Sequence, residues 1–307
     1  MQTNRQFKKS YFIIILYLMS LLACSGGRPP SVNSNIQPSS VNSMFTQQAL
    51  NKLMEADIIL IGETHDHPQH HQIQAELIKK LKPQTVAFEM LNTDQQQALD
   101  QLETKPPSDW DNWLAWSQRG WPDFELYQPV FEAAIRVKAK LLAAHPHPSV
   151  LAPLKIGAEL PSKLKEQLKL DAPLPDEQEA IMEEEIKVAH CGHASPPIVE
   201  AMIKAQRLKD SWMANQLLQS TGKRVLIVGR GHIHPQRGIP WAIKQLDPDS
   251  SLKVAIISLA EQVSKDIDDS TVFKHLHLKV KAHRHDDPCE RFKEQLKKLK
   301  QHHGQHK

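Results

Sequence analysis

Five short apolar runs stand out along the chain. They are four to six residues long and cover 57–61, 85–88, 141–144, 224–228 and 253–258. Runs of this length that lack a polar residue at every second position are typical of parallel strands buried on both faces. We therefore predict a mostly parallel sheet with these runs as its strands.

Helical patterns separate the apolar runs. After the first run, apolar residues recur at helical spacing at Ile73, Leu77, Ile78 and Leu81. A second pattern starts at about Phe124, and a third begins near the Pro196–Pro197 pair. Strands that alternate with helices predict an α/β fold, in which helices flank the sheet. Residues 92–190 carry almost no strand signal, so we predict a small all-helical subdomain there.

The N-terminus has the pattern of a lipoprotein signal peptide over residues 1–24. Basic residues precede an apolar run over 11–23, which is shorter than the roughly 20 residues of a membrane-spanning helix. The run ends in Leu-Ala-Cys, and we predict that Cys24 carries the acyl chains of a lipid anchor. Because Ser25 and not aspartate follows the cysteine, we expect the protein at the outer membrane of a Gram-negative envelope.

Composition divides the rest of the chain into three parts. Residues 25–44 are rich in Ser, Asn, Pro and Gly and are predicted to form a flexible tether. A folded domain over 45–291 follows, and 292–307 form a tail rich in His and Lys. The net charge of +3 and the lack of a basic stripe argue against a nucleic-acid partner.

Two predicted strands end in the same Gly-x-x-His pattern, at 62–65 and at 229–232. The carboxyl ends of parallel strands meet at one edge of a sheet, where α/β proteins bind their ligands. A glutamate also ends the 85–88 run. The polar cluster predicted at this edge comprises Glu63, His65, Glu89 and His232.

This cluster has more than one interpretation. The carboxylate and imidazole groups of this cluster are suitable ligands for a divalent metal ion. In a metal-dependent hydrolase, His65 and His232 would bind the ion, and Glu63 or Glu89 would act as general base on a bound water. In a purely structural envelope protein, the same groups would only hydrogen-bond to one another. The sequence has no nucleophile elbow, phosphate loop or dinucleotide fingerprint, so no other reaction class is indicated.

One tyrosine remains once the predicted signal peptide is removed. The chain has three tyrosines, and Tyr127 is the one beyond residue 24. A tyrosinate oxygen is an established ligand of ferric haem iron. The alternative is a structural tyrosine whose hydroxyl donates to a buried carbonyl.

Three further residues have two interpretations each. Arg207 lies three positions before Asp210 and would pair with it along a helix, or would bind a haem propionate in bidentate fashion. Cys191 and Cys289 would form a disulfide in an oxidising compartment, or would remain separate thiols.

Taken together, these motifs resemble the ChaN-like haem-binding uptake lipoproteins of the Tiki superfamily. The resemblance runs from about Ala56 to Glu290. It rests on ordered blocks at 60–65, 87–90, 121–129, 190–193, 205–207 with Asp210, 229–232 and 287–289. It departs just before the last block, where His275, His277 and Val280 replace an aromatic-rich strand, so the end of the domain is left open.

The resemblance implies how such a domain would work. It implies an α/β sheet with a small helical domain, and ferric haem held between the two subunits of a homodimer. It also implies a tyrosine on the iron, and Tyr127 matches by position. A histidine of the second subunit would support the other face of the haem, and we assign His193 to that role. The implied function is haem or iron uptake or storage. The Tiki relatives that use paired Gly-x-x-His motifs for metal-dependent peptide hydrolysis keep the hydrolase alternative open.

Overall fold

The computed structural model describes residues 47–102, 107–261, 274–280, 289–290 and 293. The predicted signal peptide, the tether and all of the predicted tail except Lys293 therefore lie outside the described residues. Within these ranges, none of the helices has the length and hydrophobicity needed to cross a membrane.

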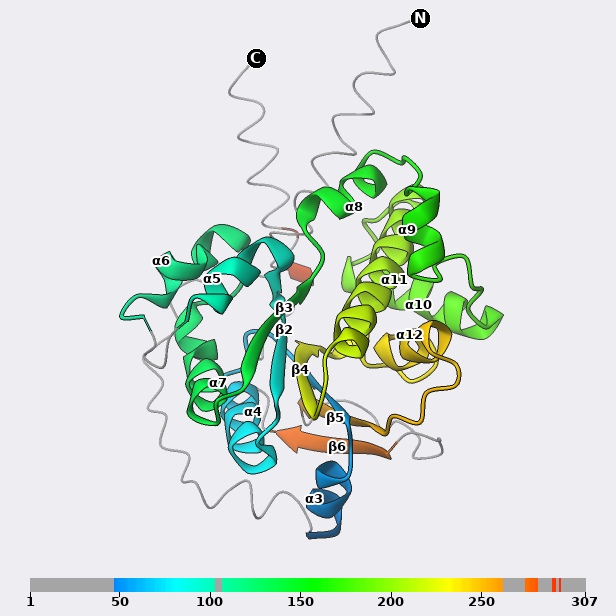
Figure 1. Ribbon diagram of the computed structural model, residues 1–307. Coiled ribbons are helices and arrows are strands. Elements are labelled where there is room, and N and C mark those ends of the chain that lie inside the picture. The colour runs from blue at the N-terminus through cyan, green and yellow to red at the C-terminus, as the bar shows by residue number, and fades with distance from the viewer. Residues whose placement is uncertain (1–46, 103–106, 262–273, 281–288, 291–292, 294–307) are drawn as a thin grey trace, which may run out of the picture.

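A parallel sheet forms the centre of the fold (Figure 1). Its strands are β1 (Ile58–Glu63), β2 (Thr85–Asn92), β3 (Lys140–His145), β4 (Arg224–Gly229), β5 (Val254–Glu261) and β6 (Lys274–Val280). They lie in the order β3-β2-β4-β1-β5-β6, and each neighbouring pair is parallel. All five predicted apolar runs are strands, and the α/β class is confirmed.

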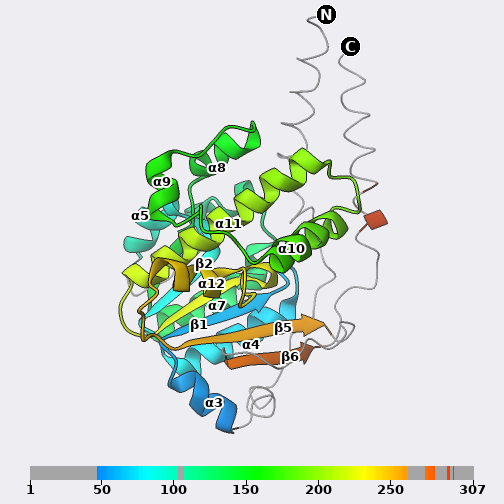
Figure 2. The ribbon, with the colours of Figure 1, turned by 90° about the vertical axis from the view of Figure 1, so that its right-hand side faces the viewer.

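Helices cover both faces of the sheet. On one side lie α3 (Gln47–Met54), α4 (Pro68–Leu81), α5 (Gln96–Asp100), α6 (Trp110–Leu114) and α7 (Phe124–Arg136). On the other side lie α8 (Pro148–Lys155), α9 (Ser162–Gln167), α10 (Asp176–Ala189), α11 (Pro196–Gln219) and α12 (Ile239–Leu246). Short 3-10 turns occur at Thr93–Gln95, Trp116–Arg119 and Arg230–His232. Figure 2 shows α11 and α12 lying across their face of the sheet.

Both faces of each central strand are apolar because each faces a different core. Successive side chains of a strand point to opposite faces. In β1, Ile59 and Ile61 pack in the core that contains α4 and α7, and Ile58 and Leu60 pack in the core that contains α11 and α12. All four residues are fully buried. This double burial explains why the sequence shows continuous apolar runs.

The predicted all-helical subdomain over 92–190 is wrong in its extent. Strand β3 lies inside this range and pairs with β2, and α7 packs against the main sheet. The helical part is confined to α8, α9 and α10, where Leu154, Leu160 and Leu168 pack against Leu208 of α11. The four-residue apolar run of β3 is short, and only its pairing with β2 identifies it as an edge strand.

Two links join the helical part to later segments of the chain. Arg237, which is buried, donates to both carboxylate oxygens of Glu185 on α10 at 2.6 Å and to Gln178 at 3.1 Å. A disulfide joins Cys191, in the loop between α10 and α11, to Cys289. The structure thus contains the disulfide that was one of the two alternatives for these cysteines.

The segment before the Asp-Pro-Cys block, where the sequence departs from its relatives, is nevertheless a strand. His275, His277 and Val280 belong to β6, which pairs in parallel with β5. Leu276, Leu278 and Val280 alternate along β6 and pack in the core that contains α4 and α7. Aliphatic residues thus provide the buried face here.

The first glycine of the first Gly-x-x-His motif permits close packing against the second motif. A Cβ atom at Gly62 would lie 2.3 Å from Cδ1 of Ile233, the residue that follows His232. Both residues are buried between the sheet and its helices, so little room exists for Ile233 to move.

We expect Gly62→Ala to lower the free energy of unfolding by about 1–3 kcal/mol, because it overpacks a filled core. Ile233→Val removes the clashing Cδ1 atom, so the double variant should regain part of the loss. Urea unfolding of the wild type, both single variants and the double variant measures this. Equal transition midpoints for Gly62→Ala and the wild type would contradict the packing argument.

Candidate functional site

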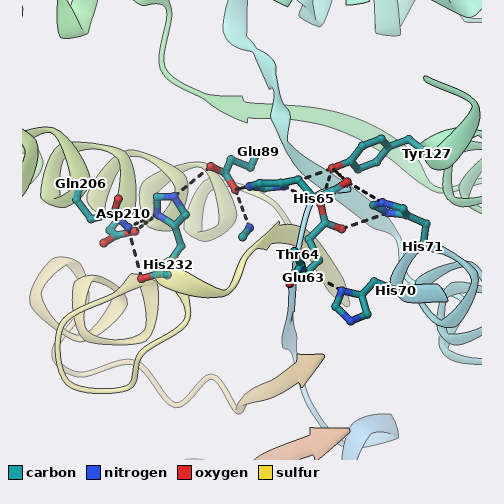
Figure 3. Close-up of polar contacts among 12 residues, drawn as sticks. Glu63, Thr64, His65, His70, His71, Glu89, Tyr127, Gln206, Asp210 and His232 are labelled. Carbon is teal, nitrogen blue, oxygen red and sulfur yellow. Dashed lines mark hydrogen bonds and ion pairs between the residues drawn. The ribbon is translucent and has the colours of Figure 1, made fainter. Parts of the chain in front are cut away.

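The predicted polar cluster forms at the carboxyl edge of the sheet (Figure 3). Glu63 is the last residue of β1, Glu89 lies in the second half of β2, and His232 lies in the turn after β4. Because these three strands are parallel neighbours, their carboxyl ends meet at one edge. His65 follows β1 directly and lies between the two glutamates. The structure therefore brings together all four residues predicted from the strand ends.

Glu63 is the centre of one half of the cluster. The hydroxyl of Tyr127, on α7, donates to its Oε1 at 2.6 Å, and the amide of Gln74 donates to its Oε2 at 2.5 Å. His65 Nδ1 lies 2.9 Å from Oε1. Burial alone raises the pKa of a carboxyl group. The charge of His71 and the hydrogen bonds of the two imidazoles outweigh it and hold the pKa of Glu63 well below its usual range.

Two residues of this half were not found from the sequence, His71 and Gln74 on α4. The Nε2 atom of His71 donates to the backbone carbonyl of His65 at 2.9 Å, and its ring lies 4.2 Å from that of Tyr127. Both side chains are fully buried on the same helix as Ile73 and Leu77. Polar residues on the buried side of an amphipathic helix are the signal that would have identified them.

His232 is the centre of the other half of the cluster. Its Nε2 lies 3.0 Å from Oε1 of Glu89, and its Nδ1 lies 2.5 Å from Oδ1 of Asp210 on α11. The other oxygen of Glu89 accepts from the backbone N–H of Gly229 at 2.7 Å. Burial opposes the charge on the imidazole, but the two carboxylates outweigh it and raise the pKa of His232 to about 10. Burial raises the pKa of Asp210 to about 6.

His65 connects the two halves. Its Nε2 lies 3.9 Å from Oε2 of Glu89, while its Nδ1 contacts Glu63. Its side chain is 24% exposed, which makes it the accessible part of a largely buried network. The ring of Trp121 lies against it edge-on, with 4.9 Å between centroids. Burial lowers the pKa of His65, but the hydrogen bond that its ring donates to Glu63 and the charge of Glu89 raise it above its usual value.

Gly229 is required by the position of the His65 ring. A Cβ atom at Gly229 would lie 2.8 Å from Nε2 and 3.1 Å from Cε1 of His65. The two Gly-x-x-His motifs therefore interlock. Gly62 of the first motif faces Ile233, directly after the second motif, and Gly229 of the second motif faces His65 of the first.

Tyr127 is fully buried in this arrangement, with 0% of its surface exposed. Its hydroxyl donates to a carboxylate, and His65 lies within 3.3 Å of it. The hydroxyl also lies 3.3 Å from the backbone carbonyl oxygen of His65, so the buried carbonyl considered for a structural tyrosine is present beside the carboxylate. Its role as an iron ligand stays a prediction.

Arg207 and His193 lie outside the network that the described contacts form. The guanidinium of Arg207 donates to the carbonyl of Ala172 and lies 5.6 Å from the ring of Trp241. Of the two alternatives for Arg207, the described contacts do not include the pairing with Asp210, because Asp210 pairs with His232. His193 is exposed in the loop between α10 and α11. Cys24 lies outside the described residues.

The described residues contain no group of three or more His, Cys, Asp or Glu side chains arranged to hold a metal ion. A physical reason is visible at His232. A metal-binding imidazole has to be deprotonated on the ligating nitrogen, whereas here both ring nitrogens contact carboxylates.

One further histidine at this edge was missed by the sequence analysis. His145 ends β3, and its Nδ1 donates to the carbonyl of Pro146 at 2.9 Å. Burial and the nearby charge of Lys209 lower the pKa of His145 to about 3. The signal was its position directly after the 141–144 run, the same position relative to a strand that identified Glu89.

The charge on His232 predicts how stability depends on pH. A histidine whose pKa is raised by folding contributes stability in full below its unfolded pKa and loses it as the pH rises through the folded pKa. For His232 this window runs from about 6.5 to about 10. We expect the free energy of unfolding to fall across this window, and to fall less in His232→Gln.

Urea unfolding at intervals between pH 6.5 and 10 measures this dependence. His147→Gln is the matched control, because His147 lies at the start of α8 and contacts Ser149. We expect His147→Gln to lose stability with rising pH as steeply as the wild type. If His232→Gln loses stability equally steeply, His232 is not the charged group responsible for the dependence.

Comparison with known proteins agrees with this fold. A protein-family model described as "Haem-binding uptake, Tiki superfamily, ChaN" matches residues 49–243. Among solved structures, the chain in "Cofacial heme binding to ChaN of Campylobacter jejuni" has a TM-score of 0.60 and 24% identity, covering 72% of this chain and 87% of that one. This likeness shows the shared fold.

A second structure, the type III effector HopBA1, has a TM-score of 0.36 and 11% identity, covering 75% of this chain and 91% of that one. The search of curated proteins finds no match. The family match spans more than half of the chain and includes every residue of the cluster at the carboxyl edge. The chain belongs to the ChaN family of haem-binding uptake proteins in the Tiki superfamily.

Proposed function

We propose that this protein binds ferric haem and serves haem or iron uptake or storage, anchored to the outer membrane through a lipid on Cys24. The observation that carries the proposal is the family match over 49–243, which contains the entire polar cluster. The fold shared with the Campylobacter jejuni structure supports it. Haem would supply the ferric iron and a flat apolar ring, and the chain would supply the ligands and a surface for that ring.

The described residues fit haem in part. His65 is a partly exposed imidazole at the carboxyl edge, and the aromatic ring of Trp121 lies beside it. An aromatic side chain next to a ligand group suits the apolar face of a porphyrin. Tyr127 is the predicted iron ligand, but its hydroxyl donates to Glu63 and is buried. Ligation by Tyr127 therefore requires this hydrogen bond to break and the side chains packed around the buried phenol to move, so that iron can reach its oxygen.

A homodimer is part of the proposal. His193 is exposed in the loop that Cys191 ties to Cys289, so it is accessible to a second copy of the chain. A loop fixed by a disulfide presents a side chain in a limited set of positions, which favours a defined contact.

The alternative of a metal-dependent hydrolase has one observation in its favour and one against it. The paired Gly-x-x-His motifs do converge at one edge. However, His232 has a carboxylate on each ring nitrogen, and no described group of side chains is arranged for a metal. Elemental analysis of the purified protein separates the two functions, since a transition metal bound at one per chain without haem would favour the hydrolase.

We expect titration of the mature protein with hemin to give the visible spectrum of tyrosinate-ligated ferric haem. Tyr127→Phe should abolish this spectrum, because the phenol oxygen is the ligand atom. Trp113→Phe is the control, since Trp113 is 43% exposed on α6 and donates to a backbone carbonyl outside the cluster. An unchanged spectrum in Tyr127→Phe would remove Tyr127 from the ligands, and a lack of hemin binding by the wild type would contradict the proposed function.

The membrane anchor is tested separately. We expect Cys24→Ala to move the protein from the membrane fraction to the soluble fraction after cell lysis, because the acyl chains would have no attachment site. Immunoblots of the two fractions measure this. A variant that remains with the membrane as completely as the wild type would argue against lipid anchoring.

A further inference from the structure

Two buried donors beside the polar cluster have no acceptor. The Nδ1 atom of His70 accepts from the backbone N–H of Thr64 at 3.0 Å, so the ring proton lies on Nε2. Among the described residues, neither Nε2 of His70 nor Oγ1 of Thr64 has a hydrogen-bond partner, although both atoms are shielded from solvent, and Asp66 of the same loop accepts from neither. A buried donor of this kind is costly and rare in folded proteins. An acceptor bound beside these atoms would satisfy both of them.

The two donors share one place in the fold. Thr64 directly follows β1, and His70 lies in the first turn of α4 and contacts it. Buried donors without a partner also occur on α11, at Arg207 and Trp212. However, Arg207 donates to Ala172 through another nitrogen, and Trp212 packs among the leucines of the helical part. The pair at the end of β1 is therefore the one placed at the ligand-binding edge.

The ring of His70 has a fixed orientation. It stacks on the ring of His67, with 4.0 Å between centroids and 10° between planes, and the N–H of Thr64 holds its Nδ1 atom. The residue has no exposed surface. Figure 3 shows His70 on the side of Thr64 away from Tyr127, with its second ring nitrogen directed away from the other labelled side chains. The proton on Nε2 is therefore not used by the network around Glu63.

The charges around these donors favour an anion. Arg230 follows Gly229, which is the register partner of Glu63, so Arg230 lies beside Thr64. Its side chain is exposed, and its positive charge acts on His70. Helix α4 also begins here, and the N-terminus of a helix carries partial positive charge.

A carboxylate has the chemistry that this place requires. It accepts several hydrogen bonds, and an arginine and a helix N-terminus both stabilise its charge. Haem carries propionate carboxylates as well as iron. Thr64 lies in the chain between Glu63 and His65, whose side chains both contact the hydroxyl of Tyr127. The donors are therefore adjacent to the predicted iron ligand.

We propose that Nε2 of His70, the hydroxyl of Thr64 and the guanidinium of Arg230 form the binding site for a haem propionate. This inference rests on the proposed function and adds the part of the ligand that hydrogen bonds would recognise. The carboxylate enters beside Arg230, because this exposed side chain can move without disturbing the core. The propionate is thus assigned to the loop between β1 and α4 and not to Arg207, the residue that the sequence suggested.

The test compares hemin with hemin dimethyl ester, whose propionates are methyl esters without negative charge. Both ligands are titrated into the mature wild-type protein and its variants. We expect the wild type to bind hemin at least about tenfold more tightly than the ester, because a charged acceptor forms the stronger hydrogen bonds.

Thr64→Val and Arg230→Gln should lose most of this preference. We expect each to bind hemin about fivefold to tenfold more weakly and to bind the ester like the wild type. Thr64→Ser keeps the hydroxyl, and Arg136→Gln removes an exposed arginine at the end of α7, just before β3 starts at the opposite edge of the sheet. Both of these controls should resemble the wild type with either ligand.

His70→Leu removes the other donor and should show the same selective loss. Its ring is buried, so Thr64→Val and Arg230→Gln decide the test if His70→Leu does not fold.

Two results would overturn this inference and leave haem binding intact. One is an equal loss of affinity for hemin and for the ester in Thr64→Val and Arg230→Gln, which indicates a role in the fold alone. The other is wild-type affinity for both ligands in these variants, as expected if a buried water satisfies the donors. A wild type that binds neither ligand would overturn the proposed function itself.

Discussion

A buried carboxylate at the end of β1 determines how the rest of the carboxyl edge is arranged. Glu63 has no exposed surface on its side chain, and an ionised carboxylate in such a place is unfavourable unless it is fully hydrogen-bonded. Tyr127, Gln74 and His65 provide those bonds from α7, α4 and the strand end. The positions of these three side chains follow from the need to satisfy one charge.

The same network limits what the site can bind. A phenol that donates to Glu63 has to exchange that bond for a bond to iron, and the carboxylate has to find another donor. The exchange opposes ligand binding, because an unsatisfied buried charge is costly.

The two Gly-x-x-His motifs are matched to each other as much as to any ligand. Gly62 allows Ile233 to approach, and Gly229 allows the His65 ring to lie above it. Through Glu89, His65 and His232 become parts of one charged assembly. Packing and charge therefore account for both motifs, and their presence does not by itself imply a metal centre.

The sequence by itself determined the α/β class, the central strands and the convergence of Glu63, His65, Glu89 and His232, because strand runs are local patterns and the ends of parallel strands meet at one edge. Only the tertiary structure decided which side chains form hydrogen bonds and ion pairs with one another. His71 and Gln74 enter the cluster from α4, the helix that follows β1, and Asp210 enters it from α11. Arg207 points to Ala172 and Trp241 and not to Asp210. Local periodicity specifies which face of a helix is buried, but a hydrogen-bond partner is chosen by the three-dimensional packing of several elements, which no local pattern contains.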